Sequence, residues 1–205
     1  MPSKPSSEAS SERADARRNR ELLIGAAREA IAEKGLDVSS LEIAERAGLG
    51  VGTLYRRFTT KEALLEAVLL DLLAELAEEA RAATDDPDPW TGLQRFLTAM
   101  TRAQRTNHGL SELIGAEHDP VTARATADLR HALAGLVDRA RDAGAIRDDV
   151  TVGDVAFLAK ATLVGDRCIG IAASPDQPER CLAVMLDGLR PPGATALPGR
   201  APRSR

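Results

Sequence analysis

The side chains best suited to bind another molecule lie in the segment VGTLYRRF, which spans Val51 to Phe58. Four of its side chains carry O–H or N–H groups that can donate hydrogen bonds to phosphate oxygens or to base edges. They are Thr53, Tyr55, Arg56 and Arg57. Leu54 and Phe58 are four residues apart, so in a helix they share a second, apolar face. The segment therefore predicts a short helix that packs into a core on one side and presents donors on the other.

The residues before this segment predict the elements that must position it. Ser39 precedes Glu42 by three residues, which is the spacing of a capping box and indicates a short helix that runs to about Ala47. Gly48 follows, where a left-handed residue would end that helix. A longer helix comes first, from about Ala14 to Lys34. Two short helices joined by a glycine turn after a longer helix predict a helix-turn-helix.

These motifs resemble a known family. The segment LEIAERAGLGVGTLYRRFTTKEALLEAVL, Leu41 to Leu69, resembles the DNA-binding signature of the TetR family of bacterial transcriptional regulators, and the resemblance is strong over about Glu21 to Leu73. The closing LDGLRPP, Leu186 to Pro192, resembles a common ending of the last helix in this family. The resemblance implies an all-α fold of about nine helices: an N-terminal three-helix helix-turn-helix DNA-binding domain and a C-terminal helical ligand-binding and dimerisation domain.

The segment departs from the family pattern at two positions. Ser40 stands three residues before Ile43, where the family is usually apolar, and Leu41 is its neighbour. This difference suggests that the start of the helix is shifted by one residue. Arg57 stands where the family frequently has His, which keeps a donor at this position and fixes its positive charge.

The resemblance also implies which residues contact DNA. Gly52 would let the backbone lie close to the DNA, Lys61 would clamp a phosphate, and Arg17 with Arg18 and Arg20 would form a basic arm ahead of the first helix that reaches the minor groove. The implied DNA-binding residues are Arg17, Ser39, Ser40, Gly52, Thr53, Tyr55, Arg56, Arg57 and Lys61. Two alternatives remain. Tyr55 would be a core residue instead of a DNA contact, and the arginines of the arm would be solvated surface charges without a role in DNA binding.

Helical periodicity continues through the rest of the chain. Thr59 and Thr60 are expected to cap a long helix that reaches about Ala83. Further helices are expected over residues 90–105, 110–117, 121–143 and 152–173, followed by a last helix with Leu182, Met185, Leu186 and Leu189 on one face. The predicted domains are a disordered N-terminal extension, 1–12, a helix-turn-helix DNA-binding domain, 13–60, a ligand-binding and dimerisation domain, 61–190, and a disordered tail, 191–205.

Composition narrows the class of protein. The chain has 205 residues, only 2% of them aromatic, so an aliphatic helical core is favoured over a β-sandwich. Two cysteines are too few for a disulfide framework. The sequence has no run of 18 apolar residues, so no membrane span is predicted. Residues 13–65 hold ten Lys or Arg against eight Asp or Glu, whereas residues 66–190 hold 13 against 21. A cytoplasmic protein is expected, with an anionic partner for its first part only.

An effector site is expected between the long helix and the body that follows it, for a mainly apolar small molecule. The candidate lining residues are Leu93, Phe96, Leu97, Met100, His108, Leu113, His118, Leu133 and Phe157. The histidines do not have zinc-ligand spacing, and no catalytic triad, phosphate loop or dinucleotide motif is present, so no metal, no cofactor and no enzyme activity are expected. Cys168 and Cys181 are interpreted as buried small residues, with a redox pair as the alternative.

The resemblance to the TetR family implies a homodimeric repressor that binds a palindromic DNA operator and is released by a small-molecule effector. Two copies are needed because one recognition helix reads only a few base pairs. The apolar segments Val152–Ala173 and Gln177–Leu189 are the expected dimer surface. Two alternatives are an all-helical enzyme or small-molecule-binding module with an incidental helix-turn-helix, and a transcriptional activator of the same fold.

Overall fold

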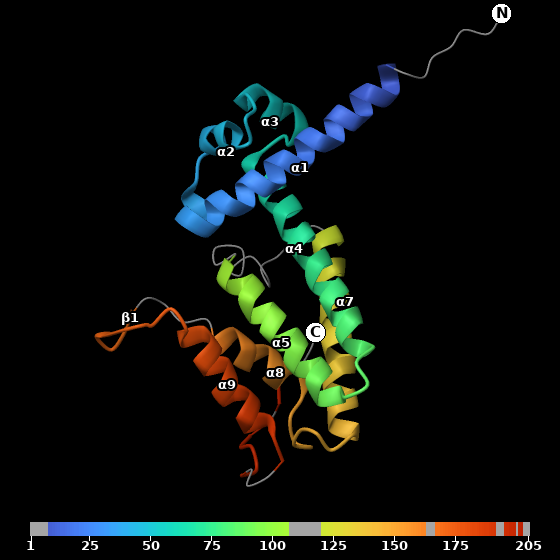
Figure 1. Ribbon diagram of the computed structural model, residues 1–205, viewed down its shortest axis with the longest axis vertical. Coiled ribbons are helices and arrows are strands. Elements are labelled where there is room, and N and C mark those ends of the chain that lie inside the picture. The colour runs from blue at the N-terminus through green and yellow to red at the C-terminus, as the bar shows by residue number, and fades with distance from the viewer. Residues whose placement is uncertain (1–7, 107–119, 163–166, 192–194, 200, 203–205) are drawn as a thin grey trace, which may run out of the picture. The chain divides into compact units, whose positions relative to one another are not determined.

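The protein is described by a computed structural model that covers residues 8–106, 120–162, 167–191, 195–199 and 201–202 (Figure 1). These residues form eight α-helices, one short 3-10 helix and two strands of two residues each. They divide into two compact units, one with the described residues up to Asp71 and one with those from Leu72 onward. The all-α fold with an N-terminal helix-turn-helix is therefore confirmed.

The first unit packs three helices around a small aliphatic core. These are α1 (Glu8–Lys34), α2 (Ser40–Arg46) and α3 (Val51–Arg57), with the 3-10 helix η1 (Gly35–Asp37) between α1 and α2. Their inward faces are buried at 6% exposure or less, including the predicted pair Leu54 and Phe58; the residues are Leu23, Ala27, Ala30, Ile31, Ile43, Ala44, Leu54 and Phe58. Burial of these stripes, more than helix propensity, fixes α2 and α3, because seven-residue helices are unstable alone.

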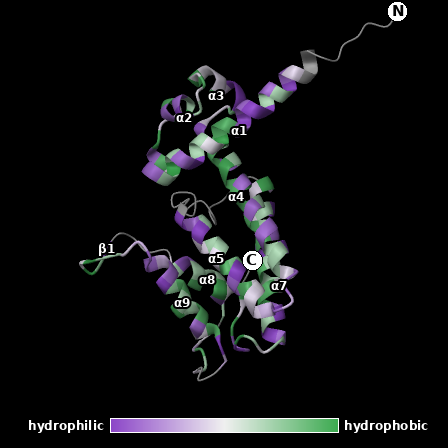
Figure 2. Ribbon diagram, viewed as in Figure 1, coloured by the Kyte–Doolittle hydropathy of each residue, from purple (hydrophilic) through white to green (hydrophobic). Residues whose placement is uncertain are grey.

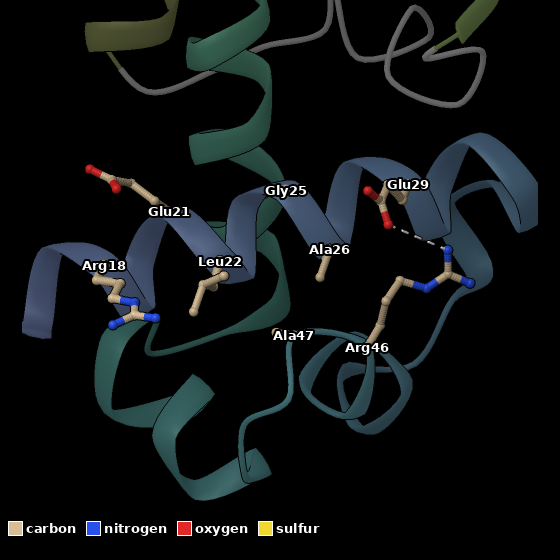
Figure 3. A pocket seen from close by; sticks show the side chains of 8 residues that line it. All are labelled: Arg18, Glu21, Leu22, Gly25, Ala26, Glu29, Arg46 and Ala47. Atoms are coloured by element: carbon tan, nitrogen blue, oxygen red, sulfur yellow. Dashed lines mark ion pairs between the residues drawn. The ribbon is translucent and has the colours of Figure 1, made fainter.

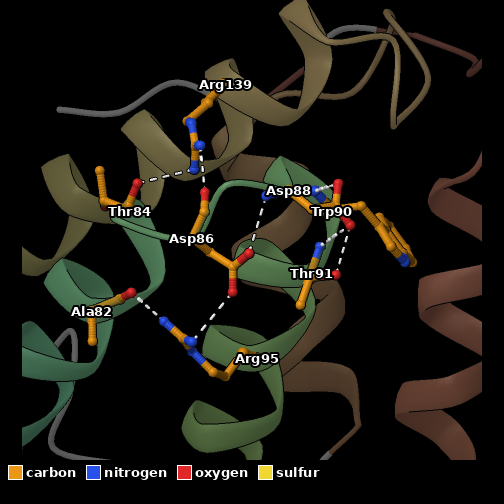
Figure 4. A network of polar contacts seen from close by, with 8 residues as sticks. All are labelled: Ala82, Thr84, Asp86, Asp88, Trp90, Thr91, Arg95 and Arg139. Carbon is orange, nitrogen blue, oxygen red and sulfur yellow. Dashed lines mark hydrogen bonds and ion pairs between the residues drawn. The ribbon is translucent and has the colours of Figure 1, made fainter.

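Helix α4 (Lys61–Thr84) begins in the first unit and ends in the second. Its start is capped as predicted by Thr60, whose Oγ1 accepts the N–H of Ala63 at 3.1 Å. Its end is held by two arginines of other helices (Figure 4). Arg139 donates to the carbonyls of Thr84, at 3.0 Å, and Asp86, at 2.5 Å. Arg95 donates to the carbonyl of Ala82 and forms an ion pair with the Asp86 carboxylate at 3.3 Å.

The second unit contains α5 (Pro89–Thr106), α7 (Pro120–Asp142), α8 (Val152–Ala161) and α9 (Gln177–Leu189). Asp88 caps α5, because its carboxylate accepts the N–H groups of Trp90 and Thr91 and the Thr91 hydroxyl at 2.6 Å; these bonds hold the pKa of Asp88 below its usual value. The helices alternate hydrophobic and hydrophilic residues along their length (Figure 2). The stripe predicted for the last helix is buried: Leu182, Met185, Leu186 and Leu189.

The predicted helix over residues 152–173 is wrong in its second half. Helix α8 ends at Ala161, and a hairpin of β1 (Arg167–Cys168) and β2 (Ile171–Ala172) follows. Ile169 and Gly170 both have positive φ, 45° and 83°, as a two-residue hairpin turn requires. An isoleucine rarely adopts this conformation, so the sequence carried a weak turn signal here.

Other sequence boundaries also need correction. Helix α1 begins at Glu8, six residues before the expected Ala14, so residues 8–12 are helical where disorder was predicted. The helix expected over residues 110–117 lies outside the described residues. Cys168 is exposed and Cys181 is half-buried, so neither is the buried residue that was predicted.

The described part of the C-terminal tail contacts the α7–α8 connection, where a free tail was predicted. Arg147 and Asp149 form an ion pair with a closest distance of 2.5 Å. Each of these two side chains also binds the backbone of the tail. Arg147 donates to the carbonyl of Thr195, and the Leu197 N–H donates to the Asp149 carboxylate at 3.0 Å. Arg147 and the Leu197 N–H hold the pKa of Asp149 well below its usual range. Tail docking should therefore persist at neutral pH and weaken only in strong acid, when Asp149 is protonated.

Helix α5 approaches the end of α4 at Gly92, where a Cβ atom would lie 2.4 Å from the Ala83 carbonyl oxygen. We expect Gly92→Ala to lower the free energy of unfolding by about 1–3 kcal/mol, because the backbones must separate. The matched control is Gly135→Ala in α7, where the added Cβ meets no atom within 4 Å. It should raise stability by about 0.5–1 kcal/mol, as measured by urea denaturation. Equal effects at the two glycines would contradict this close approach.

Candidate nucleic-acid interface

The α2–turn–α3 hairpin is built by a cap and a left-handed glycine. The Ser39 hydroxyl accepts the N–H of Glu42 at 3.2 Å, so Ser39 is the N-cap of α2 and Ser40 its first residue. The start of α2 is therefore not shifted past Ser40, and Leu41 is left on the surface. Gly48 has a φ of 67°, and the N–H of Leu49 returns to the Ala44 carbonyl at 2.9 Å. This turn directs the chain into α3.

Helix α3 has one buried and one open face. Leu54 is fully buried, whereas Tyr55 is 49% exposed and both Arg56 and Arg57 are exposed. The alternative of Tyr55 as a core residue is therefore excluded for the single chain. Arg56 donates to the Thr53 hydroxyl at 3.0 Å, which holds its guanidinium along the helix surface. The face offers several donors and, among its side chains, no carboxylate.

Gly52 lies on the same open face. A Cβ atom at Gly52 would meet no atom within 4 Å, so no neighbour inside the chain requires glycine there. Its φ is not in the left-handed region. A side chain at this position would therefore be met only by a molecule that approaches from outside, which agrees with the expected close approach of a backbone to DNA.

Lys61, the expected phosphate clamp, is half-buried at the start of α4. Its ammonium group donates to the carbonyl of Leu36 at 2.6 Å and so ties α4 to η1. An ammonium group has three donors, so this bond leaves N–H groups for a further acceptor. The sequence did not indicate this second, structural contact of Lys61.

The basic arm predicted ahead of the first helix does not exist as an arm. Arg17, Arg18 and Arg20 lie within α1, because this helix starts at Glu8. Arg17 forms an exposed ion pair with Glu21 at 3.7 Å. The guanidinium of Arg20 lies 5.8 Å from the centre of the Phe58 ring, a distance at which a cation and an aromatic face attract each other. These arginines are therefore fixed on a helix, and a role in DNA binding stays a prediction.

A shallow groove of about 370 Å³ lies between α1 and the end of α2 (Figure 3). Small residues and Leu22 line it together with charged side chains of both signs; the lining is Arg18, Glu21, Leu22, Gly25, Ala26, Glu29, Arg46 and Ala47. Arg46 forms a bidentate pair with Glu33, at 2.6 and 2.7 Å, and lies 4.0 Å from Glu29. These contacts connect α1 to α2, and the carboxylates make the groove a poor surface for DNA.

The described residues that were predicted to line an effector site belong to the second unit, but they do not share one environment. Five of them are buried in its core: Leu93, Phe96, Leu97, Met100 and Leu133. Phe157 is 66% exposed, because it lies on the side of α8 opposite the buried Val155 and Ala159, so it does not line the interior of the chain. His108, Leu113 and His118 lie outside the described residues. The sequence missed Thr101 on α5, which is 3% exposed and thus as buried as its apolar neighbours.

The described residues contain neither a metal-binding cluster nor a membrane-spanning helix. In those ranges no set of three or more His, Cys, Asp or Glu side chains is grouped so that it could hold a metal ion. No helix within the described ranges combines the length and the apolar character that a membrane span needs.

Two family models match the chain. Residues 23–68 match the bacterial regulatory proteins of the TetR family, and residues 88–191 match the C-terminal domain of SbtR-like transcriptional regulators. The first match contains α2, α3 and the start of α4. The second contains α5 to α9.

Individual proteins give the same result. A TetR transcription regulatory protein from Mycobacterium vanbaalenii is 35% identical, with a TM-score of 0.63 over 87% of this chain and 98% of its own. The TetR regulator SCO0520 from Streptomyces coelicolor is 30% identical, with a TM-score of 0.62 over 85% and 99%. The HTH-type regulator YvdT of Bacillus subtilis is 39% identical over 79 residues, and this match spans 38% of the chain and 41% of YvdT.

The open face of α3 and the start of α4 give a first prediction for DNA binding. We expect Tyr55→Phe to weaken operator binding about three- to tenfold through the loss of one hydrogen bond. Lys61→Ala should weaken binding on all sequences and reduce the slope of log affinity against log salt by about one. Fluorescence anisotropy at several salt concentrations measures both effects.

The control for charge is Arg130→Ala, which removes an exposed cationic side chain of α7 in the other unit. It should leave the affinity and the salt slope unchanged. If Lys61→Ala behaved like Arg130→Ala, Lys61 would have only its structural contact with Leu36.

Proposed function

Because this chain belongs to the TetR family of transcriptional regulators, we propose that it is a homodimeric repressor that binds a palindromic operator and leaves it when a small-molecule effector binds. The DNA-binding residues proposed are those of the α2–α3 hairpin and the start of α4. A cytoplasmic location, with access to chromosomal DNA, is part of the same proposal.

The observation that carries this proposal is the open face of α3. Tyr55, Arg56 and Arg57 are exposed together on a helix whose other face is fixed in the core by Leu54. Such a face suits insertion into a major groove, where arginine recognises guanine and tyrosine contacts phosphate. The proteins matched by the chain are transcriptional regulators, which disfavours the enzyme alternative.

A dimer is supported by apolar side chains that the single chain leaves on its surface. Phe157 and Leu158 are exposed on α8, Ile169 and Ile171 on the hairpin, and Val184 on α9. Val184 is 73% exposed on the side of α9 opposite the stripe that packs inside the chain. The proposed dimer surface is therefore the outer side of α8 and α9, and not the stripe of Leu182 to Leu189. Two recognition helices would then bind half-sites about 34–36 Å apart or a multiple of that distance.

Release by an effector requires coupling between the two units, and α4 is the element common to both. Its first residue, Lys61, is tied to η1, and its last turn is held by Arg95 and Arg139. A shift of α5 or α7 on effector binding would therefore act on α4 through these bonds. An effector that prefers the DNA-incompetent state about 100-fold would weaken operator binding by about 2.7 kcal/mol.

A gel-shift experiment with DNA from upstream of the chain's own coding sequence tests the proposal. We expect retardation by the wild-type chain, and none by a variant in which Arg56 and Arg57 are both alanine. The double variant should keep the helical circular dichroism of the wild type, because both side chains are exposed. A reporter fused to the same DNA separates repressor from activator: removal of the protein raises expression in the first case and lowers it in the second.

The dimer surface gives a separate prediction. Phe157→Glu should convert the dimer to a monomer in light scattering at micromolar concentration, because a charge would be buried without a partner. The matched control is Val121→Glu, which places the same charge on α7 at a position that is 63% exposed and outside the proposed surface. It should leave the dimer intact. A wild-type chain that is monomeric at this concentration would refute the dimer, and a dimer that survives Phe157→Glu would refute this surface.

A further inference from the structure

The buried face of α5 changes character along the helix. Its first turns contribute the apolar core residues Leu93, Phe96, Leu97 and Met100. The same face continues with Thr101 and Gln104, which follow Leu97 by four and seven residues. A helix that packs only against its own core has no reason to place two polar side chains on this face.

The oxygen atoms of these two side chains have no partner. Thr101 Oγ1 and Gln104 Oε1 are both shielded from solvent, and neither makes a hydrogen bond. By contrast, the buried hydroxyl of Thr162 donates to the Ala159 carbonyl at 2.7 Å. On α5 itself, the half-buried Thr98 donates to the Gln94 carbonyl at 2.8 Å. On α5, the missing hydrogen bonds are therefore confined to the C-terminal part of its buried face.

A buried oxygen without a hydrogen bond destabilises a protein, because its hydration is lost without replacement. A valine and a leucine would fill these positions without that loss. Polar residues that cost stability in the free protein are typical of positions where a bound molecule supplies the missing bond.

We propose that Thr101 and Gln104 are the polar end of the effector site and that they accept hydrogen bonds from the effector. This inference rests on the proposed function, since it assigns residues and a ligand class to the effector-binding step. The Met100 side chain and its apolar neighbours on α5 would contact the remainder of the molecule.

The polarity of the buried residues indicates the chemical class of the ligand. The buried polar residues among those described are three threonines, Thr101, Thr122 and Thr162, and no charged side chain is buried with them. A charged ligand would therefore be buried without a counter-charge, which is strongly unfavourable. The ligand class that fits is an uncharged, mainly apolar small molecule with at least one O–H or N–H donor.

The test uses two matched probe pairs, phenol with anisole and indole with 1-methylindole, which differ by the presence of the donor. Calorimetric titration of the wild-type chain should show about three- to tenfold tighter binding of phenol and indole than of their methylated partners. In Thr101→Val and Gln104→Leu this preference should fall toward one. The control Thr98→Val removes a hydroxyl that already has a partner, and it should keep the preference.

Thermal unfolding without ligand gives a second, independent readout. Thr101→Val and Gln104→Leu should raise the melting temperature by about 2–4 °C, because each removes an unsatisfied buried atom, whereas Thr98→Val should not. A ligand role thus predicts variants that are more stable and less selective.

Two results would overturn the inference. One is equal or undetectable binding within both probe pairs, as expected if a buried water satisfies the two oxygens. The other is a donor preference that survives both substitutions. Failure of the proposed function is distinguishable, because it would appear as missing operator binding by the unliganded wild type, while the probe preference is measured without DNA.

Discussion

Helix α4 is shared by the two compact units, and its last carbonyl groups cannot be satisfied within the helix itself. Arginines from α5 and α7 supply the missing donors, and Gly92 allows the α5 backbone to come close enough for this contact. The core of the second unit, the capping of α5 by Asp88 and the course of the chain after Thr84 all depend on this junction. At its other end, α4 is tied to η1 by Lys61, one of the residues proposed to contact DNA.

Whether a polar group has a hydrogen-bond partner inside the chain separates structural residues from those proposed to be functional. Arg95, Arg139 and Arg147 use their donors on carbonyl groups of the chain, so their charges are committed to the fold. Arg57 and Tyr55 are exposed on α3, where a partner can reach them. Thr101 and Gln104 are the reverse case, because their oxygens are buried and still lack a bond. Exposed donors and buried unpaired acceptors thus mark the two places where another molecule is expected.

The apolar groups follow a similar division. On α9, Leu182, Met185, Leu186 and Leu189 complete the core of the chain, while Val184 faces outward. On α8, Val155 and Ala159 are buried and Phe157 is not. Both helices therefore carry an inner apolar side and an outer apolar side, as expected for helices placed between the core of one chain and a second copy.

The sequence alone determined the local structure of the helix-turn-helix, because caps, turns and short-range periodicity depend on neighbours in the chain: Ser39, Gly48 and Leu54 are enough to define it. It also predicted the long helix and its cap at Thr60. Only the tertiary structure decided the rest. The hairpin after α8 has an isoleucine at positive φ, the tail docks through Arg147 and Asp149, Phe157 faces outward, and Thr101 is buried without a partner. The hairpin pairs close neighbours around a turn with a weak sequence signal. The other three depend on contacts between residues far apart in the chain, where a side chain's type does not reveal which side of an element will be covered.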